Sequence, residues 1–318
     1  MVYQVPFPEQ LANFEYVRLY FHLESTDCFD LPEFALLQLR RELLLALKSL
    51  TAQTEDSAVI WLKNLLFPPL PEDPLVLRRM QKPAPALVLN PDISQAGLIE
   101  SHQRIVLPVL LVGQAMPELS VFTRLLARLG QQGIYKGNGH YFVAAIETED
   151  ASGVRSMLWV HGDAEAEVFP PLSDLAWWLE RQQPLAQNCR INVLTPMRLI
   201  HQGRPLFKAD FSELFPFILR RVSALLAHYG QVELIHDASH FQSLAQQIMT
   251  HDNHLRWKDW RRLRNHQGGQ NLGGLVGSLD LSGGALKDLS WVLHLGSLFN
   301  IGKGAAFGAG QYALTVPE

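Results

Sequence analysis

Near its end, the chain of 318 residues contains the stretch Ile301-Gly-Lys-Gly-Ala-Ala-Phe-Gly-Ala-Gly-Gln-Tyr312, with glycine at positions 302, 304, 308 and 310. Glycines at this spacing let the backbone reach positive φ and let a bulky ligand approach its N–H groups closely. A tight helix-to-strand connection would use the same residues. A Walker loop is excluded, because no Ser or Thr follows Lys303 and the next residues are typical of a strand.

The residues before this glycine loop (residues 301–312) alternate between strand and helix patterns. In chain order, the predicted elements are strand 190–202, interrupted at Pro196, helix 211–229, helical turns within 238–250, strands 255–264 and 272–281, helix 286–299 and strand 311–316. The order βαββαβ predicts a ferredoxin-like domain.

The first half of the chain has the same order of elements. Residues 14–24 alternate, with Val17, Leu19, Phe21 and Leu23 on one face and Tyr16, Arg18, Tyr20 and His22 on the other. The predicted elements that follow are helix 33–50, a helical piece at 57–67, strands 86–89 and 104–112, helix 117–131 and strand 141–148. The sequence therefore predicts an α+β fold with tandem ferredoxin-like domains, related to the RRM. We expect domains at 1–150 and 189–318, joined by a linker region, 151–188, with a helix near 172–181.

The composition limits the classes of function. The formal net charge of −4 argues against a protein that coats nucleic acid indiscriminately, so any RNA site must be local. No segment approaches the roughly 20 apolar residues that a membrane helix needs. Cys28 and Cys189 are too few for a disulfide framework or a cysteine-rich zinc site. The first residues lack the pattern of an export signal, so we expect a cytoplasmic protein.

Four segments together resemble one known family. The glycine loop follows the helical segment LKDLSWVLHLGSLF, which ends at Phe299. The others are LTPMRLIHQG at 194–203, RLRNHQ at 262–267 followed by LGGLVGSLDLSG at 272–283, and GIYKGNG at 133–139. These segments are similar to those of the CRISPR-associated endoribonucleases of the RAMP superfamily, which cut precursor CRISPR RNA at its repeats. The resemblance covers roughly residues 104–315 and implies tandem ferredoxin-like domains that bind repeat RNA.

The densest run of positive charge lies in the predicted strand 255–264. Period-two alternation places Leu255, Trp257 and Leu263 on one face and a basic stripe on the other. Sheets bind RNA through such surfaces, which pair with phosphates and stack on bases. A solvated helix with inward tryptophans is the alternative structure. The RNA-binding residues that we predict are Arg256, Lys258, Trp260, Arg262, Arg264, Gly302, Lys303, Gly304, Gly308 and Gly310.

The resemblance also implies a reaction. In it, the ribose 2′-hydroxyl attacks the adjacent phosphate without a metal ion or any other cofactor, leaving a cyclic phosphate and a 5′-hydroxyl. The step needs a base, an acid and positive charge near the phosphorane. Many family members place a histidine in or near the first helix, whereas helix 33–50 contains none. The catalytic candidates are His22, Tyr20, Arg40 and Arg41. His140, beside the glycine run 133–139, is a further histidine candidate.

Three hypotheses follow. The leading one is a metal-independent, repeat-specific endoribonuclease that keeps its product or passes it to a CRISPR effector complex. The second is a RAMP subunit that holds guide RNA without cutting it, which the missing helix histidine favours. The third is a protein-interaction module without RNA. In the first two hypotheses, the partners are CRISPR repeat RNA or mature CRISPR RNA, and effector-complex subunits are further candidates. We expect no association with a membrane.

Overall fold

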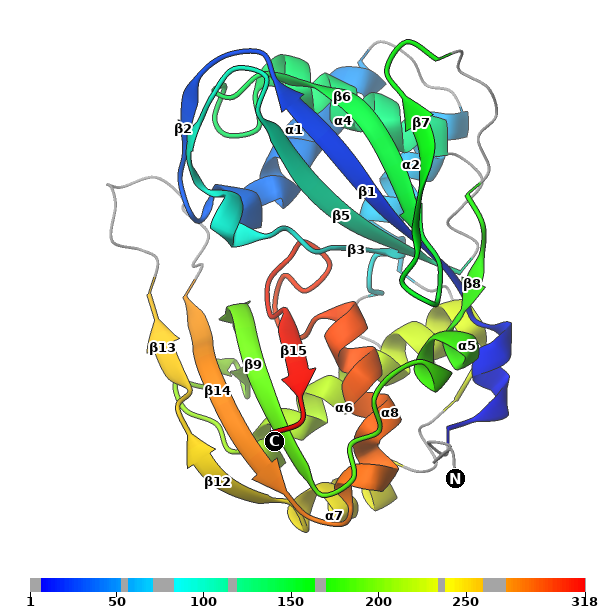
Figure 1. Cartoon of the computed structure of the whole chain (residues 1–318), viewed down its shortest axis with the longest axis vertical. Coiled ribbons are helices and arrows are strands. Elements are labelled where there is room, and N and C mark those ends of the chain that lie inside the picture. Colours follow the sequence, from blue (N-terminus) through cyan, green and yellow to red (C-terminus); the bar gives the residue numbers. More distant parts are fainter. Residues whose placement is uncertain are drawn as a thin grey trace. The chain divides into compact units, whose positions relative to one another are not determined.

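The structure is a computed structural model that describes residues 7–52, 57–70, 83–113, 119–163, 170–233, 238–259 and 273–317. The chain divides into two compact units. The N-terminal unit is Phe14–Asp174, and the C-terminal unit is Leu175–Glu318 together with Met1–Asn13 (Figure 1). The division falls inside the predicted linker, because strands at 155–160 and 173–174 pair with the sheet of the N-terminal unit.

The N-terminal unit contains one main antiparallel sheet. Its elements are β1 Glu15–Ser25, β2 Phe29–Leu31, η2 Ala35–Gln38, α1 Leu39–Thr51, α2 Ser57–Leu66, β3 Leu87–Leu89, η3 Ile93–Gln95, β4 Gly97–Ile99, β5 Arg104–Val112, α4 Leu119–Gln132, β6 Tyr141–Glu149, β7 Arg155–Val160 and β8 Ser173–Asp174. The sheet has the order β3-β5-β1-β6-β7, and β8 pairs with β1. Within the βαββαβ unit, the strand order 2-3-1-4 is that of a ferredoxin-like fold, which confirms the prediction.

The helices α1 and α4 pack on each other and lie behind one face of this sheet in Figure 1. The residues that alternate inward along β1 form the core on that side, as predicted. Phe21 is fully buried, and its ring lies 5.5 Å from that of Phe122 in α4. The other residues of β1, among them Tyr20 and His22, therefore lie on the helix-free face of the sheet.

The C-terminal unit repeats the architecture. Its elements are η1 Glu9–Asn13, α5 Leu175–Glu180, β9 Asn188–Met197, β10 Ile200–His201, β11 Arg204–Pro205, α6 Phe211–Gly230, α7 Ala238–Gln246, β12 Met249–Asn253, β13 Arg256–Lys258, β14 Gly274–Ser282, α8 Leu286–Phe299 and β15 Tyr312–Thr315. The sheet order is β12-β14-β9-β15, and β13 also pairs with β14. One face packs on helices, because Tyr312 donates its hydroxyl to the carbonyl of Leu293 in α8 at 2.6 Å.

Two elements of this unit differ from the sequence-based expectation. Residues Met249–Asn253 form strand β12 instead of continuing the helical turns, because they pair with β14 from Ser282 to Leu279. The strand β9 does not stop at Pro196 but continues to Met197. Proline cannot donate a backbone hydrogen bond, and the β9–β14 register shifts beside it, between Leu275 and Gly277.

Candidate nucleic-acid interface

The glycine loop has the backbone conformation that its sequence predicts. Gly302, Gly304, Gly308 and Gly310 have φ values of 88°, 90°, 92° and 69°. Residues with a side chain rarely adopt this region, because the Cβ atom approaches the backbone. The loop therefore depends on glycine at all four positions for its path.

Backbone hydrogen bonds anchor the loop to the end of β9. The N–H of Lys303 donates to Arg198 at 2.8 Å, and the N–H of Gly310 donates to Pro196 at 3.1 Å. A Cβ atom at Gly302 would lie 2.6 Å from the carbonyl oxygen of Arg198, and one at Gly310 would overlap the carbonyl of Ile301. These two glycines are thus required by close packing of backbone on backbone.

The middle of the loop is different. Gly304 and Lys303 are exposed to solvent. A Cβ atom at Gly304 would meet only the Cβ atom of Ala309, at 3.3 Å. A side chain at Gly304 would therefore crowd one methyl group but no backbone atom, and this part of the loop presents its backbone and one positive side chain to solvent.

Strand β13 confirms the start of the predicted basic strand. Arg256 and Lys258 are exposed on one side of it, whereas Trp257 between them is half-buried. The Trp257 ring packs on Phe207 at 4.6 Å, and the guanidinium of Arg198 lies 5.7 Å from it. The other predicted members, Trp260, Arg262 and Arg264, lie outside the described residues.

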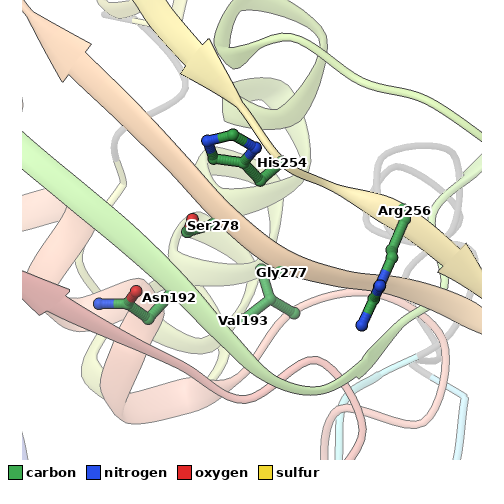
Figure 2. A pocket seen from close by; sticks show the side chains of 6 residues that line it. All are labelled: Asn192, Val193, His254, Arg256, Gly277 and Ser278. Atoms are coloured by element: carbon green, nitrogen blue, oxygen red, sulfur yellow. The ribbon is translucent and has the colours of Figure 1, made fainter.

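The helix-free face of the C-terminal sheet contains an open depression of about 580 Å³ beside Arg256. Figure 2 shows the six residues that line it: Asn192 and Val193 from β9, Gly277 and Ser278 from β14, Arg256 from β13 and His254 just ahead of β13. Of these, sequence reasoning identified Arg256 alone. Asn192, Ser278 and His254 form no recognisable sequence motif together, and only the strand register brings them together.

At one end of this face, Arg190 and Asp280 form a two-pronged ion pair. The Arg190 Nε and Nη2 atoms donate to the two carboxylate oxygens at 2.5 and 2.6 Å. These hydrogen bonds, together with nearby His254 and His251, lower the pKa of the Asp280 carboxyl. This end of the face therefore carries an ionised acid whose charge is balanced by its own arginine.

In the N-terminal unit, the predicted catalytic Tyr20 belongs to a compact polar network. Its hydroxyl donates to Glu149 Oε2 at 2.5 Å, and Arg18 donates to Glu149 Oε1 at 2.6 Å. Arg155 also donates to Glu149, at 3.1 Å, and its guanidinium lies 3.6 Å from the centre of the Tyr20 ring. One carboxylate on β6 thus joins three side chains from two other strands, β1 and β7.

This network affects the acidity of its members. Burial, followed by the hydrogen bond to Glu149, raises the pKa of Tyr20, so the phenol stays protonated at neutral pH. Burial by itself would raise the pKa of Glu149. The hydrogen bonds and charges of Tyr20, Arg18 and Arg155 outweigh it, and the net pKa of Glu149 is lowered.

The other predicted catalytic residues occupy two places. His22 lies two residues beyond Tyr20 on β1, and its Nε2 atom is 3.1 Å from Glu147 Oε2. Arg40 is half-buried in α1, with its guanidinium 5.5 Å from the centre of the Phe67 ring. Arg41 is exposed, and its Nε atom lies 4.0 Å from Glu42. The structure brings His22 and Tyr20 together on one strand and Arg40 and Arg41 together on one helix.

A second histidine–carboxylate pair lies beyond the end of β1. The Nδ1 atom of His140 is 3.1 Å from Asp27 Oδ2, and both side chains are nearly half exposed. The sequence placed His140 beside a glycine run but gave no sign of its partner, which is 113 residues away.

The described part of the chain contains no group of three or more His, Cys, Asp or Glu residues placed to hold a metal ion. Among the described helices, none is long and apolar enough to cross a membrane.

Two family models match the sequence. Residues 191–312 match the model of the CRISPR-associated endoribonuclease Cas6, and residues 14–170 match AF_1859_N, a model of an N-terminal domain. The first match contains most of β9, the residues that line the depression, and the glycine loop. A search of curated protein sequences found no significant match.

Solved structures match nearly the whole chain. A partial Cas6-RT-Cas1–Cas2 complex has a TM-score of 0.56 at 14% identity, over 96% of this chain and 47% of that one. Cas6 of Thermus thermophilus has a TM-score of 0.53 at 13% identity, over 95% and 99%. A Cas6 product complex has a TM-score of 0.51 at 12% identity, over 94% and 99%. This chain therefore spans about half the length of the reverse-transcriptase fusion and nearly all of a separate Cas6. Residues 191–312 are thus similar in sequence to Cas6, and nearly the whole chain is similar in fold to Cas6 structures.

Proposed function

We propose that this chain binds CRISPR repeat RNA and cleaves it to release mature CRISPR RNA. The observation that carries the proposal is the glycine loop within the region that matches Cas6. Its glycines hold a positive-φ path, and its middle presents Lys303 and the backbone at Gly304 to solvent. Backbone N–H groups and a lysine are suited to contact the phosphates of RNA.

The proposed reaction uses a nucleophile within the substrate. The ribose 2′-hydroxyl loses its proton to a base and attacks the adjacent phosphorus, while the departing 5′-oxygen gains a proton from an acid. A cyclic phosphate and a 5′-hydroxyl result. Because the nucleophile is already positioned, the reaction requires proton transfer and positive charge but no metal-bound water.

Four residues are candidates for these roles. We assign His22 as the base, because Glu147 contacts its ring and can orient it. Tyr20 is protonated at neutral pH and is the candidate acid. Arg40 and Arg41 are the remaining candidates, for holding the scissile phosphate, but α1 covers the opposite face of the sheet, so they do not act on the same phosphate as His22 and Tyr20.

The test is incubation of the protein, in EDTA, with the repeat RNA encoded beside its gene. Cleavage should continue, and replacing the 2′-hydroxyl upstream of the cut by hydrogen should stop cleavage while leaving binding nearly intact. Cleavage that EDTA abolishes and manganese restores would reject the metal-independent mechanism. Continued cutting of the deoxy substrate would show that water is the nucleophile.

A second candidate function is a RAMP subunit that holds guide RNA without cutting it. Helix α1 contains no histidine, and the functional groups of Tyr20 and His22 both face carboxylates. Tight stoichiometric binding of repeat RNA without products at any pH would favour this function. Retention of the RNA within an effector complex is a further prediction that applies to both functions.

The glycine loop offers an internal control for RNA binding. Gly304→Val should weaken RNA binding more than it lowers the unfolding midpoint, because its Cβ atom would meet only the Cβ atom of Ala309, at 3.3 Å, and no backbone atom. Gly310→Val should damage folding and binding together, because its side chain would overlap the backbone of Ile301. If the unfolding midpoint and the RNA affinity fell together in both variants, the loop would have a structural role and no role in RNA binding.

A further inference from the structure

The depression in the C-terminal sheet exists because of its local backbone. Gly277 supplies no side chain to fill it, and its φ of 119° places a hypothetical Cβ atom against the carbonyl of His254. On the opposite side, the register of β9 shifts between the pairs Leu275–Met197 and Gly277–Val193. The shift inserts extra residues into β9 and bends it locally. The strand arrangement thus leaves an open hollow where a regular sheet would present side chains.

The groups around this hollow are polar and held in place. Asn192 and Ser278 face each other across β9 and β14 as register partners. The Asn192 amide donates to Thr315 at 3.2 Å, which fixes its plane. The backbone N–H of His254 donates to the carbonyl of Ser278 at 2.9 Å, which fixes the backbone from which the exposed imidazole extends. An amide, a hydroxyl and an aromatic ring are the groups that proteins use to contact an unpaired base.

The charged residues around the hollow determine which end of it a phosphate would occupy. Arg256 lines it, and Lys258 is exposed two residues further along β13. In Figure 2 the Arg256 side chain extends from β13 toward β9. At the other end of the face, Asp280 is ionised and paired with Arg190. A phosphate is therefore attracted toward Arg256 and Lys258, whereas the Asp280 end, where Arg190 balances the negative charge, offers no net attraction.

We propose that this hollow binds one unpaired nucleotide of the RNA, with its base against Asn192, Ser278 and His254 and its phosphate at Arg256. The inference rests on the proposed function, because it takes repeat RNA as the ligand. An open site on the face of a sheet suits a single strand, which can enter and leave along the surface, whereas a duplex would keep its bases stacked and paired inside. The site would make binding depend on an unpaired base at one position of the repeat.

The test is a scan in which each unpaired base of the repeat RNA is removed in turn. For the wild-type protein, removal of one particular base should lower affinity about tenfold, the effect of losing a stacked base. In Asn192→Ala/His254→Ala, affinity for intact RNA should fall by a similar factor. Removing the same base should then have less than a twofold further effect, because the base and the pocket are one interaction.

His240→Ala is the matched control, because His240 is an exposed histidine of the same unit, on α7. It should behave as the wild type does. Ser278→Ala is a second pocket variant, should the double variant unfold at a lower temperature than the wild type. The inference would be overturned if removing the base lowered affinity by the same factor in the pocket variants and in the wild type. If the protein still bound and cut repeat RNA in that case, the proposed function would stand. If the wild-type protein neither binds nor cleaves repeat RNA, the proposed function fails and this inference fails with it.

Discussion

The two units carry the same strand order, but the helix-free faces of their sheets differ in how polar groups are used. On the N-terminal sheet, Glu149 gathers Arg18, Tyr20 and Arg155 into one network, and His22 contacts Glu147. Among the described residues of the C-terminal sheet, the ion pair Arg190–Asp280 lies at its end. Its centre is the hollow lined by Asn192, Ser278, His254 and Arg256, together with Val193 and Gly277.

The difference is one of charge pairing. Polar groups that satisfy one another across strands stabilise a sheet. Groups arranged around a hollow contribute less to stability and remain available to bind. We therefore expect substitutions on the N-terminal face to affect stability first and those on the C-terminal face to affect RNA binding first.

The largest effect expected is on the stability of the N-terminal unit. Glu149→Ala removes the carboxylate that Arg18 and Arg155 share and leaves two guanidinium groups close together. Since the Glu149 side chain is only 11% exposed, we expect unfolding free energy to fall by about 2–3 kcal/mol. Chemical denaturation would measure it. Glu15→Ala, at an exposed position of β1 in the same sheet, is the control and should change stability little. Unchanged stability in Glu149→Ala would show that the network does not stabilise the sheet.

The same network predicts a pH dependence. The pKa of Glu149 is lower in the folded protein than its ordinary value of 4.5, so its contribution to stability is present above about pH 4.5 and is lost as pH falls through the folded pKa. The stability difference between the wild type and Glu149→Gln should therefore shrink as the pH is lowered from 6 toward roughly 3. A difference that stays constant across this range would mean that the carboxylate charge contributes nothing.

On the C-terminal face, Arg256→Ala should weaken repeat-RNA binding severalfold without lowering the unfolding midpoint, because Arg256 is exposed. If Arg256 contacts one phosphate of a single strand, the slope of log affinity against log salt should fall by about 0.7. Arg204→Ala, in the short hairpin β10–β11 of the same unit, is a matched exposed arginine outside the hollow. Equal losses of affinity in both variants would mean that Arg256 only adds to the overall electrostatic attraction of RNA and makes no specific contact.

Sequence patterns were sufficient for the fold because both units obey period two in their strands. The alternation of β1 predicted which residues face α4, and the pattern of β13 placed Arg256 and Lys258 opposite Trp257. The glycine loop was predictable for a similar reason, since only glycine accepts its φ values without strain. β12 was missed because MTHDN lacks apolar alternation and its strand character comes from pairing with β14.

The candidate sites were less predictable because they depend on long-range register. Tyr20 and Glu149 are 129 residues apart, and no sequence pattern near either residue predicts their hydrogen bond. The hollow likewise requires β9, β13 and β14 to align so that Asn192, Ser278 and His254 meet. Asn, Ser and His are common in proteins, and these three form a candidate binding site only because the strands align in this way.

The smallest effect expected concerns the ion pair at the edge of the C-terminal face. Asp280→Asn should leave the unfolding midpoint almost unchanged, because exposed ion pairs contribute little. It should nevertheless tighten RNA binding slightly and steepen its salt dependence, since the substitution removes a negative charge and releases the Arg190 guanidinium to contact phosphate. Titrations of wild type and Asp280→Asn at several salt concentrations would measure both changes. Weaker binding by Asp280→Asn would mean that Asp280 itself contacts the RNA, and the direction inferred for the bound strand would then be wrong.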